Sequence, residues 1–345
     1  MGVLLQPLAA GFQVGVALRA AAYRHGWLQT RRLRNPVVSI GNLTLGGTGK
    51  TPLVAFVAAA LLKHGRKPAI LTRGYGRHRV ASLTAIAPGA KRNADPREIG
   101  DEPAWLARVL PEVPVVVSAD RYRAGRLAED RFGVDVHLLD DGFQHWALAR
   151  EVDIVTVDAT QELSDRALLP AGRQREPCSA LARAQLTVIT RAELSDEATL
   201  QKLERRIRRI NPVARSFRST TKICGLRDIR SGRVEPAEVF LEAIGKPVAG
   251  FCGIGNAKAF FGDLRYWGFQ VAAERAYRDH HVYTEHYLDF LRKLAVRSDA
   301  SVLVTTEKDS MNLPRAIGDL AVFATVIRAQ LSEAQAFEEA LLARI

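Results

Sequence analysis

The stretch Val37-Val-Ser-Ile-Gly-Asn-Leu-Thr-Leu-Gly-Gly-Thr-Gly-Lys-Thr-Pro52 decides the fold of this chain. Its first residues, Val37–Ile40, predict a buried strand, and the apolar run Pro52–Leu62 predicts a helix. A glycine-rich segment connects them, and glycine allows the backbone to pass close to an anion. The N–H groups of such a loop, together with the N-terminus of the following helix, face a bound phosphate. The stretch therefore predicts a phosphate-binding strand–loop–helix unit.

The loop is similar to a Walker A motif, although one position departs from the pattern. The pattern G-x-x-x-x-G-K-[ST] requires glycine at position 44, where this chain has Thr44, and the doubled Gly46-Gly47 is expected to supply the missing flexibility. We expect Lys50 to reach the β- and γ-phosphates of ATP and the Thr51 hydroxyl to coordinate Mg²⁺. The predicted nucleotide-binding residues are Thr44, Leu45, Gly46, Gly47, Thr48, Gly49, Lys50 and Thr51.

An acidic partner of the loop is expected at the end of another buried strand. The run Val136-His-Leu-Leu-Asp140-Asp141 has this form. Mg²⁺ prefers oxygen ligands and keeps several waters, so one carboxylate of the pair suffices to hold it. The residues leave open whether Asp140 or Asp141 does so, and the other aspartate then acts behind the metal or at the substrate. A pair that only caps the following segment is the alternative.

The rest of the chain alternates short apolar runs with helical stretches. Runs of this kind are typical of buried parallel strands joined by crossover helices. They predict an α/β fold with a doubly wound, mostly parallel sheet of the P-loop NTPase type. The expected strands are Val37–Ile40, Pro68–Thr72, Pro114–Val117, Val134–Leu139, Asp153–Val157 and Leu186–Thr190, with helices at Pro52–Leu62 and Arg121–Glu129.

Domain boundaries follow from the same pattern. Residues 35–212 are the expected P-loop domain, which ends in a charged helix over 199–209. Residues 213–225 are expected to be a linker, and residues 226–345 predict a second, smaller α/β domain. The strands expected in the second domain lie around Val248–Phe251 and Ser301–Thr305.

Residues 1–34 predict an N-terminal helix with a basic flank. Residues 2–18 are nearly all apolar or small, and a series of arginines follows them. A secretory signal would carry its positive charge first, and a membrane-spanning helix needs about 20 apolar residues. Every fourth residue from Leu4 to Val16 is apolar and falls on one helical face, which favours an amphipathic helix at a membrane interface. A helix packed on its own domain and a true span are the alternatives.

Positive charge is concentrated at the start of the chain. The formal net charge of the whole sequence is +12, yet residues 1–94 contain 14 Lys and Arg and no carboxylate. Such an excess indicates an anionic partner, which could be phosphate, nucleic acid or a membrane. No nucleic-acid module is visible, so we expect no nucleic-acid partner. The three cysteines lack metal or disulfide spacing, which fits a reducing cytosol.

Several further motifs stand in loops after the expected strands, where α/β sheets bind ligands. With the P-loop segment Asn42–Pro52 they are Leu71-Thr-Arg-Gly-Tyr-Gly76, Gly100-Asp-Glu-Pro103, Asp140-Asp-Gly-Phe-Gln-His145, Leu169-Pro-Ala-Gly172 with Arg175-Glu-Pro177, and Thr306-Glu-Lys-Asp309. Up to about residue 310 the chain resembles the tetraacyldisaccharide 4′-kinases of lipid A biosynthesis. The resemblance implies Mg²⁺-dependent transfer of the ATP γ-phosphoryl group to the 4′-hydroxyl of a tetraacyl glucosamine disaccharide 1-phosphate, giving lipid IVA. It also implies a location at the cytoplasmic face of the bacterial inner membrane, and we expect a monomer.

The resemblance also implies roles for single residues. Asp101 would be the base that takes the proton of the acceptor hydroxyl, with His280 as its partner, and Lys50 is the third catalytic candidate. The alternatives are an N-cap for Asp101 and a helix cap or core position for His280. Because the two residues belong to different expected domains, their joint action requires the domains to approach. Glu176 would assist at the metal or nucleotide. The expected substrate or phosphate contacts are Tyr75, Arg121, Gln144, His145 and Arg175.

One segment departs from the family, and one other function fits the P-loop. The family commonly reads Pro-Ala-Gly-Pro-Leu-Arg-Glu-Pro, whereas this chain has Arg173-Gln174 in the middle, so the resemblance does not imply the shape of that loop. The alternative function is a membrane-associated P-loop regulatory ATPase, which would dimerise with nucleotide and yield no phosphorylated small product. Such ATPases usually carry a lysine just before the loop, and Leu45 in that place argues against this alternative.

Overall fold

The structure is a computed structural model that describes residues 5–74, 83–90, 96–163, 168–314 and 321–345. Its strands are β1 (Val37–Asn42), β2 (Pro68–Thr72), β3 (Thr84–Ile86), β4 (Val115–Val117), β5 (Val136–Asp140), β6 (Val152–Asp158), β7 (Leu186–Thr190), β8 (Arg215–Asp228), β9 (Val234–Pro236), β10 (Val248–Cys252), β11 (Val271–Ala276), β12 (Val302–Thr306) and β13 (Val322–Leu331). Its α-helices are α1 (Gln6–Arg24), α2 (Lys50–Lys63), α3 (Pro96–Ile99), α4 (Asp101–Val109), α5 (Arg121–Phe132), α6 (Glu197–Ile210), α7 (Ala237–Ile244), α8 (Ala257–Tyr266), α9 (Glu285–Arg297), α10 (Glu307–Ser310) and α11 (Ala334–Leu342). Two 3₁₀ helices are η2 (Cys178–Arg183) and η3 (Ala192–Leu194).

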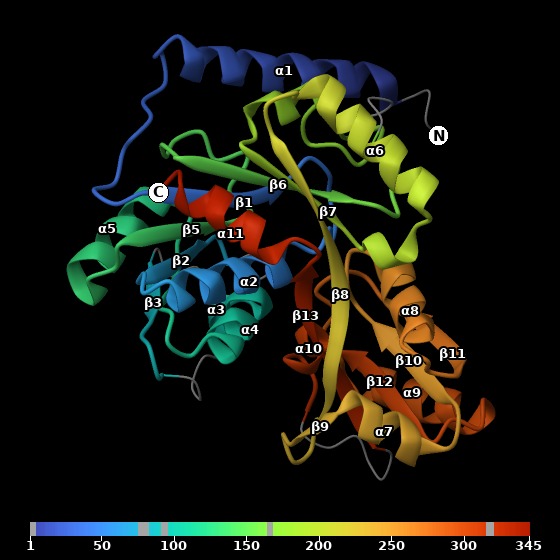
Figure 1. Ribbon diagram of the computed structural model, residues 1–345. Helices are drawn as coiled ribbons and strands as arrows, with labels where there is room; N and C mark the ends of the chain where they lie inside the picture. The colour runs from blue at the N-terminus through green and yellow to red at the C-terminus, as the bar shows by residue number, and fades with distance from the viewer. Residues whose placement is uncertain (1–4, 75–82, 91–95, 164–167, 315–320) are drawn as a thin grey trace.

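The described strands form one continuous sheet (Figure 1). Their order is β11-β10-β12-β13-β8-β7-β6-β1-β5-β2-β4-β3, with β9 paired to β8. Most neighbours are parallel, and β1 lies between β5 on one side and β6 on the other. A strand order that reverses at β1 places the ligand site at the carboxyl ends of these strands. The predicted doubly wound, mostly parallel α/β fold is therefore confirmed.

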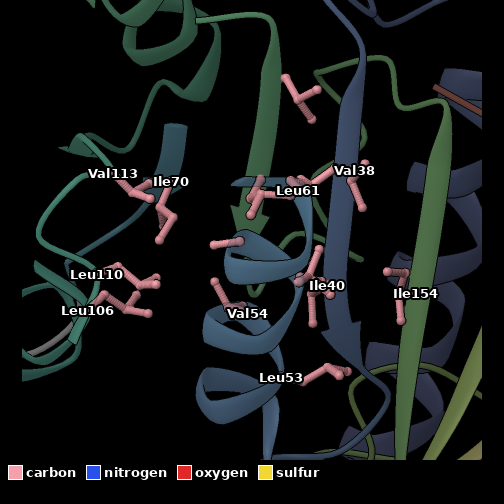
Figure 2. Close-up of a cluster of buried hydrophobic side chains, with 14 of the residues drawn as sticks. Val38, Ile40, Leu53, Val54, Leu61, Ile70, Leu106, Leu110, Val113 and Ile154 are labelled. Carbon is pink, nitrogen blue, oxygen red and sulfur yellow. The ribbon is translucent and has the colours of Figure 1, made fainter. Parts of the chain in front are cut away.

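Helices cover both faces of the sheet around β1. Val38 and Ile40 pack with Leu53 and Leu61 of α2, whereas the side chain of Val37, which points to the other face, packs on the side that α5 covers. Figure 2 shows Leu53, Val54 and Leu61 of α2 gathered around Val38 and Ile40 of β1. Every residue of β1 is buried, so both faces of the strand are covered, as expected for a central parallel strand.

The stretch 213–225, which was expected to be a linker, lies almost entirely in strand β8. This strand pairs in parallel with β7 at its start, where Leu186 lies opposite Arg215, and antiparallel with β13 along the rest of its length. It therefore joins the two parts of the sheet without a break. Many residues of β8 are polar and only half-buried, so its sequence contains no continuous apolar run. For this reason the strand was not predicted from the sequence.

The last helix does not stay with the second domain. In α11, Phe337 is fully buried, and its ring lies 6.0 Å from that of Phe56 on α2 and 5.2 Å from that of Phe217 on β8. Figure 1 shows α11 beside α2. We call residues 35–212 together with α11 the P-loop lobe, and residues 226–331 the C-terminal lobe. The predicted boundary of the second domain at 345 thus differs from the structure.

Helix α1 stands apart from the core and has no buried residue. It lies along one edge of the molecule, away from the C-terminal lobe (Figure 1). The exposed apolar side chains are not confined to one face, because Val14 lies about a third of a turn from Leu8 around the helix. The expected amphipathic pattern is therefore not confirmed. In the part of the chain described here, no helix combines the length and apolar character needed to cross a bilayer.

Candidate active site

A cavity of about 810 Å³ lies between the two lobes at the carboxyl ends of the central strands. Its floor is the loop between β1 and α2, and its walls come from both lobes. The P-loop lobe contributes Asp140 and Asp141 at the end of β5, and the C-terminal lobe contributes the loop with His280 and the helix with Lys308. All eight residues predicted to bind nucleotide, Thr44 to Thr51, line this cavity.

The P-loop has the local geometry that its glycines permit. Gly46 and Gly49 adopt positive φ values of 104° and 74°, which other residues rarely adopt. Helix α2 begins directly after Gly49, so its first turn, with Lys50 and Thr51, faces the loop. Thr48 is fixed from two sides, since its hydroxyl accepts from Asn42 Nδ2 at 2.8 Å and its carbonyl accepts from Thr190 Oγ1 at 2.9 Å. Gly46 thus supplies the flexibility that Thr44 lacks.

The two adjacent aspartates differ sharply in their surroundings. Asp140 ends β5 and is 2% exposed, and its carboxylate accepts a hydrogen bond from Thr72 Oγ1 at 3.3 Å. Burial, together with the charges of Glu102 and Asp141, raises the pKa of Asp140 to about 7. Such a group is stabilised in its ionised form by a cation.

Asp141 is already held by cations of the protein. Both Arg175 Nη atoms donate to its carboxylate, at 2.7 and 2.8 Å, and Lys50 Nζ lies 3.7 Å from Asp141 Oδ1. Enclosure in the cavity wall would raise the pKa of Asp141, but the charges of Lys50 and Arg175 hold it well below its usual range. Asp141 is therefore an ionised anchor that places Lys50 and Arg175.

Asp101 and His280 meet across the two lobes. Asp101 is the first residue of α4, and His280 Nδ1 lies 3.0 Å from its Oδ2 atom. Burial alone would raise the pKa of Asp101, but the hydrogen bond from His280 and the charge of Lys308 outweigh it and lower the pKa below its usual value. Burial would lower the pKa of His280, but the bond to Asp101 raises it above its ordinary value. The two residues therefore form a dyad.

The two members of the dyad differ in their access to the cavity. His280 lines the cavity, whereas Asp101 is 5% exposed and lies outside the set of lining residues. Lys308 Nζ stands beside the pair, 3.8 Å from Asp101 Oδ2 and 3.2 Å from both Glu102 Oε1 and Asp279 Oδ1. Of the two, His280 therefore has the more direct access to the cavity.

Backbone strain is concentrated at this cavity. Among the described residues, four non-glycine residues have positive φ, and three of them, Asp141, Arg191 and His280, line the cavity. Each such conformation costs on the order of 1–3 kcal/mol and persists where the surroundings impose it. The three positions are those that direct an anion, a cation and an imidazole toward the same space.

A second set of contacts closes the P-loop from its β6 and β7 side. Arg191 Nη1 donates to the carbonyl of Gly47 at 2.9 Å and to Asp158 Oδ2 at 2.6 Å. From the divergent segment, Arg173 Nη2 donates to the carbonyls of Leu45 and Gly255, both at 3.1 Å. The residue that departs from the family thus bridges the P-loop to the C-terminal lobe.

The substrate candidates are partly brought together. Arg121, His145, Gln144 and Arg175 all line the cavity, and Gln144 Nε2 donates to the carbonyl of Asn42 at 2.9 Å. Burial, together with the charges of Arg121 and two further arginines, lowers the pKa of His145 to about 4. This part of the cavity is therefore strongly cationic and suits an anionic group. Tyr75 lies outside the described residues.

Glu176 does not reach the cavity. It is 3% exposed, and Arg183 donates to both of its carboxylate oxygens at 2.8 and 3.1 Å. The Arg183 guanidinium in turn lies over the rings of Phe143 and Trp146. The expected role of Glu176 at the metal is therefore not supported, because the half-buried Arg183 already neutralises its charge.

The whole chain, residues 1–345, matches the family model of LpxK, described as tetraacyldisaccharide-1-P 4′-kinase. The chain belongs to the LpxK family. Among curated relatives, a tetraacyldisaccharide 4′-kinase of Geobacter metallireducens is 35% identical over 339 residues, which cover 98% of this chain and 96% of the relative. One of Anaeromyxobacter dehalogenans is 40% identical over 317 residues, which cover 90% and 81% of the two chains.

A solved LpxK structure agrees in fold over nearly the full length. The crystal structure of LpxK from Aquifex aeolicus in complex with ATP has a TM-score of 0.75 and 28% identity, and the match covers 99% of this chain and 98% of that one. The LpxK resemblance found in the sequence motifs is thereby confirmed at the level of family and fold.

Some residues at the cavity of this LpxK chain were not predicted from the sequence. Lys308 lies in the motif Thr306–Asp309, which was singled out without a role for the lysine. Arg191 follows β7 directly, and its position at a strand end was the available signal. Trp105 of α4 donates to Glu307 Oε2 at 2.9 Å and so links the lobes, but neither residue type by itself indicates such a contact.

Proposed function

We propose that this protein transfers the γ-phosphoryl group of ATP to the 4′-hydroxyl of a tetraacyl glucosamine disaccharide 1-phosphate, giving lipid IVA. One observation carries the proposal: in a member of the LpxK family, a P-loop and an Asp–His dyad that bridges the two lobes meet at one cavity. A P-loop binds the phosphates of the donor, and a base at the same cavity serves an acceptor hydroxyl. The regulatory ATPase is not favoured, because it has no use for a base at this position.

The P-loop lobe holds the donor. The amides of the P-loop and Lys50 neutralise the phosphate chain, and Asp141 keeps Lys50 directed toward the loop. Phosphoryl transfer asks the protein mainly for positioning and for neutralisation of charge. These residues therefore lower the barrier by holding the phosphates in line with the acceptor.

The cavity also fits Mg²⁺, and we assign its protein ligands to Asp140 and Thr51. Both offer oxygen, the donor that Mg²⁺ prefers, and Asp140 is a buried carboxylate that forms no ion pair within 4 Å among the described residues, although the charge of Lys50 acts on it. Asp141 is less suited because Arg175 and Lys50 occupy its oxygens. The ion would neutralise the charge that builds on the phosphates.

The Asp101–His280 dyad accepts the proton of the 4′-hydroxyl. Because His280 is the member that lines the cavity, its neutral imidazole takes the proton, and ionised Asp101 stabilises the imidazolium that forms. Lys308 keeps Asp101 ionised through its positive charge. Since the pair bridges the lobes, the site is complete only when the lobes are together, which also excludes water.

The cationic end of the cavity binds the phosphorylated sugar, and α1 contacts the membrane surface. Arg19 of α1 lines the cavity together with Arg121 and His145, and Tyr23 of α1 stacks on Trp146 at a ring distance of 6.1 Å. The acyl chains would stay in the bilayer beside the exposed apolar residues of α1 while the sugar enters below Arg19. We place the protein at the cytoplasmic face of the inner membrane, as a monomer.

The test is an assay of the full chain with ATP, Mg²⁺ and the tetraacyldisaccharide 1-phosphate in detergent. A 4′-phosphorylated product is expected, and Lys50→Ala should abolish its formation. Lys202→Ala, which removes an exposed lysine on α6, serves as the matched control and should retain full activity. A well-folded protein that binds ATP but yields no phosphorylated disaccharide would contradict the proposal.

A further inference from the structure

The two flanks of the P-loop differ in chemistry, and this difference assigns the direction of the nucleotide. On the β5 side of β1 stand Asp140, Asp141 and the His280 dyad, which the proposed function uses for metal and acceptor. On the β6 side stand Arg191 and Asp158, which close the P-loop at Gly47. With the γ-phosphate directed to the β5 side, the nucleoside must extend toward the β6 and β7 side.

The cavity on that side is lined by large apolar and aromatic side chains. They come from the loop after β10, from α8 and the residue that follows it, and from β13, and they are Ile254, Phe260, Trp267 and Ile327. Trp267 is fixed in place, since its Nε1 atom donates to the carbonyl of Thr221 at 3.2 Å. Surfaces of this kind suit the face of a purine ring, and they leave its polar edge to be satisfied by few, specific groups.

One such group is Asp263 on α8. Asp263 is one of the residues that line the cavity, it is 6% exposed, and its buried Oδ1 atom has no hydrogen-bond partner among the residues that the structure describes. The nearby Arg191 uses its Nη1 atom for Asp158 and Gly47. A buried carboxylate oxygen without a donor is costly, so its presence in a cavity wall indicates a donor on the ligand.

We propose that Asp263 determines the base specificity of the nucleotide site by accepting a hydrogen bond from the 6-amino group of adenine, with Phe260 and Trp267 against the ring. The inference rests on the proposed function, because it takes ATP as the donor. The 6-amino group is the hydrogen-bond donor on the edge of adenine, and it matches an acceptor-only carboxylate. Burial raises the pKa of Asp263 to about 7, as expected for a carboxyl group whose ionised form lacks a protein partner.

The test compares two nucleotides on the full chain by calorimetric titration, without disaccharide. Purine riboside 5′-triphosphate differs from ATP by lacking the 6-amino group. Wild-type protein should bind ATP about tenfold or more tightly than this analogue, because a buried polar group is left unpaired in the analogue complex. Asp263→Asn keeps an acceptor oxygen and should retain the preference, whereas Asp263→Leu should reduce it below about threefold.

The control and the contrary outcomes separate this inference from the function itself. Asp289→Leu removes an exposed aspartate on α9 and should leave the preference unchanged. Equal binding of both nucleotides by wild-type protein, which requires no variant to fold, would overturn the role of Asp263, as would a full preference in a folded Asp263→Leu variant. Tight ATP binding without phosphorylation of the disaccharide would overturn the proposed function and leave the assignment of Asp263 standing.

Discussion

His280 Nδ1 lies 3.0 Å from Asp101 Oδ2, and this contact joins the two lobes at the wall of the cavity. His280 adopts a φ of 60°, a backbone conformation that a histidine rarely takes. The C-terminal lobe therefore accepts local strain at the residue that completes the site. A contact of this kind positions a base and at the same time reports whether the lobes are together.

The first prediction concerns the dyad. Asp101→Asn should lower kcat about 10²- to 10⁴-fold, since it removes the charge that stabilises the imidazolium. His280→Asn should lower kcat to a similar extent. Because asparagine tolerates the positive φ at this position, this loss would not come from a change in the backbone. Steady-state rates in detergent measure both effects. Asp130→Asn, an exposed aspartate on α5, should keep the wild-type rate; a normal rate in Asp101→Asn would remove the dyad from the mechanism.

The second prediction concerns pH. The pKa of His280 lies above its ordinary value of 6.5 because Asp101 stabilises the protonated form. Neutral His280 is the base, so kcat/KM should rise with pH through this raised pKa. In Asp101→Asn, burial of His280 dominates, and the residual activity should rise at lower pH than in the wild type. A flat profile between pH 6 and 9 in the wild type would instead identify Asp101, whose pKa is lowered, as the group that meets the hydroxyl.

The third prediction concerns Arg173, which bridges the carbonyls of Leu45 and Gly255. Arg173→Ala removes a contact that holds the P-loop against the C-terminal lobe. We expect KM for ATP to rise about threefold to tenfold with a smaller change in kcat, because a hydrogen bond at an exposed position contributes modestly. Arg205→Ala on α6 is the control. An unchanged KM would show that the bridge does not support nucleotide binding.

The fourth prediction concerns α1. Leu8, Phe12 and Leu18 are 62%, 37% and 64% exposed, and changing all three to serine should reduce binding to anionic lipid vesicles at least about tenfold. Flotation measures the bound fraction, which should also fall with added salt because arginines flank the helix. Serine at Val213 and Val296, which are 84% and 79% exposed elsewhere, should leave binding intact. Equal loss in both variants would place the membrane contact outside α1.

The fifth prediction concerns the return of the chain to the P-loop lobe. Phe337→Ala should lower the free energy of unfolding by about 3–5 kcal/mol, because it empties a fully buried site between Phe56 and Phe217. Denaturant titration measures the change. Phe290→Ala, at a 40% exposed position on α9, should cost about 1 kcal/mol or less. Similar losses in the two variants would argue that α11 is not part of the P-loop core.

The sequence predicted the local units of the fold well. The strands Pro68–Thr72 and Leu186–Thr190 have the predicted bounds, and most others differ by one or two residues. Short apolar runs and glycine positions carry this information within a few neighbouring residues. Strand β8 and helix α11 were not predicted in their places, because their partners, β13 and α2, are distant in sequence and a half-polar strand has no local signature.

By itself, the sequence determined that the chain has a P-loop, a doubly wound sheet and the motifs of the LpxK family. These properties depend on residue types at short spacing, where covalent geometry and glycine conformation set the structure. Only the tertiary structure decided that His280 and Asp101 meet across the lobes, that Asp141 rather than Asp140 forms ion pairs among the described residues, and that Glu176 is neutralised by Arg183. Burial and ion pairing depend on which distant side chains fill the same space, and packing alone settles that.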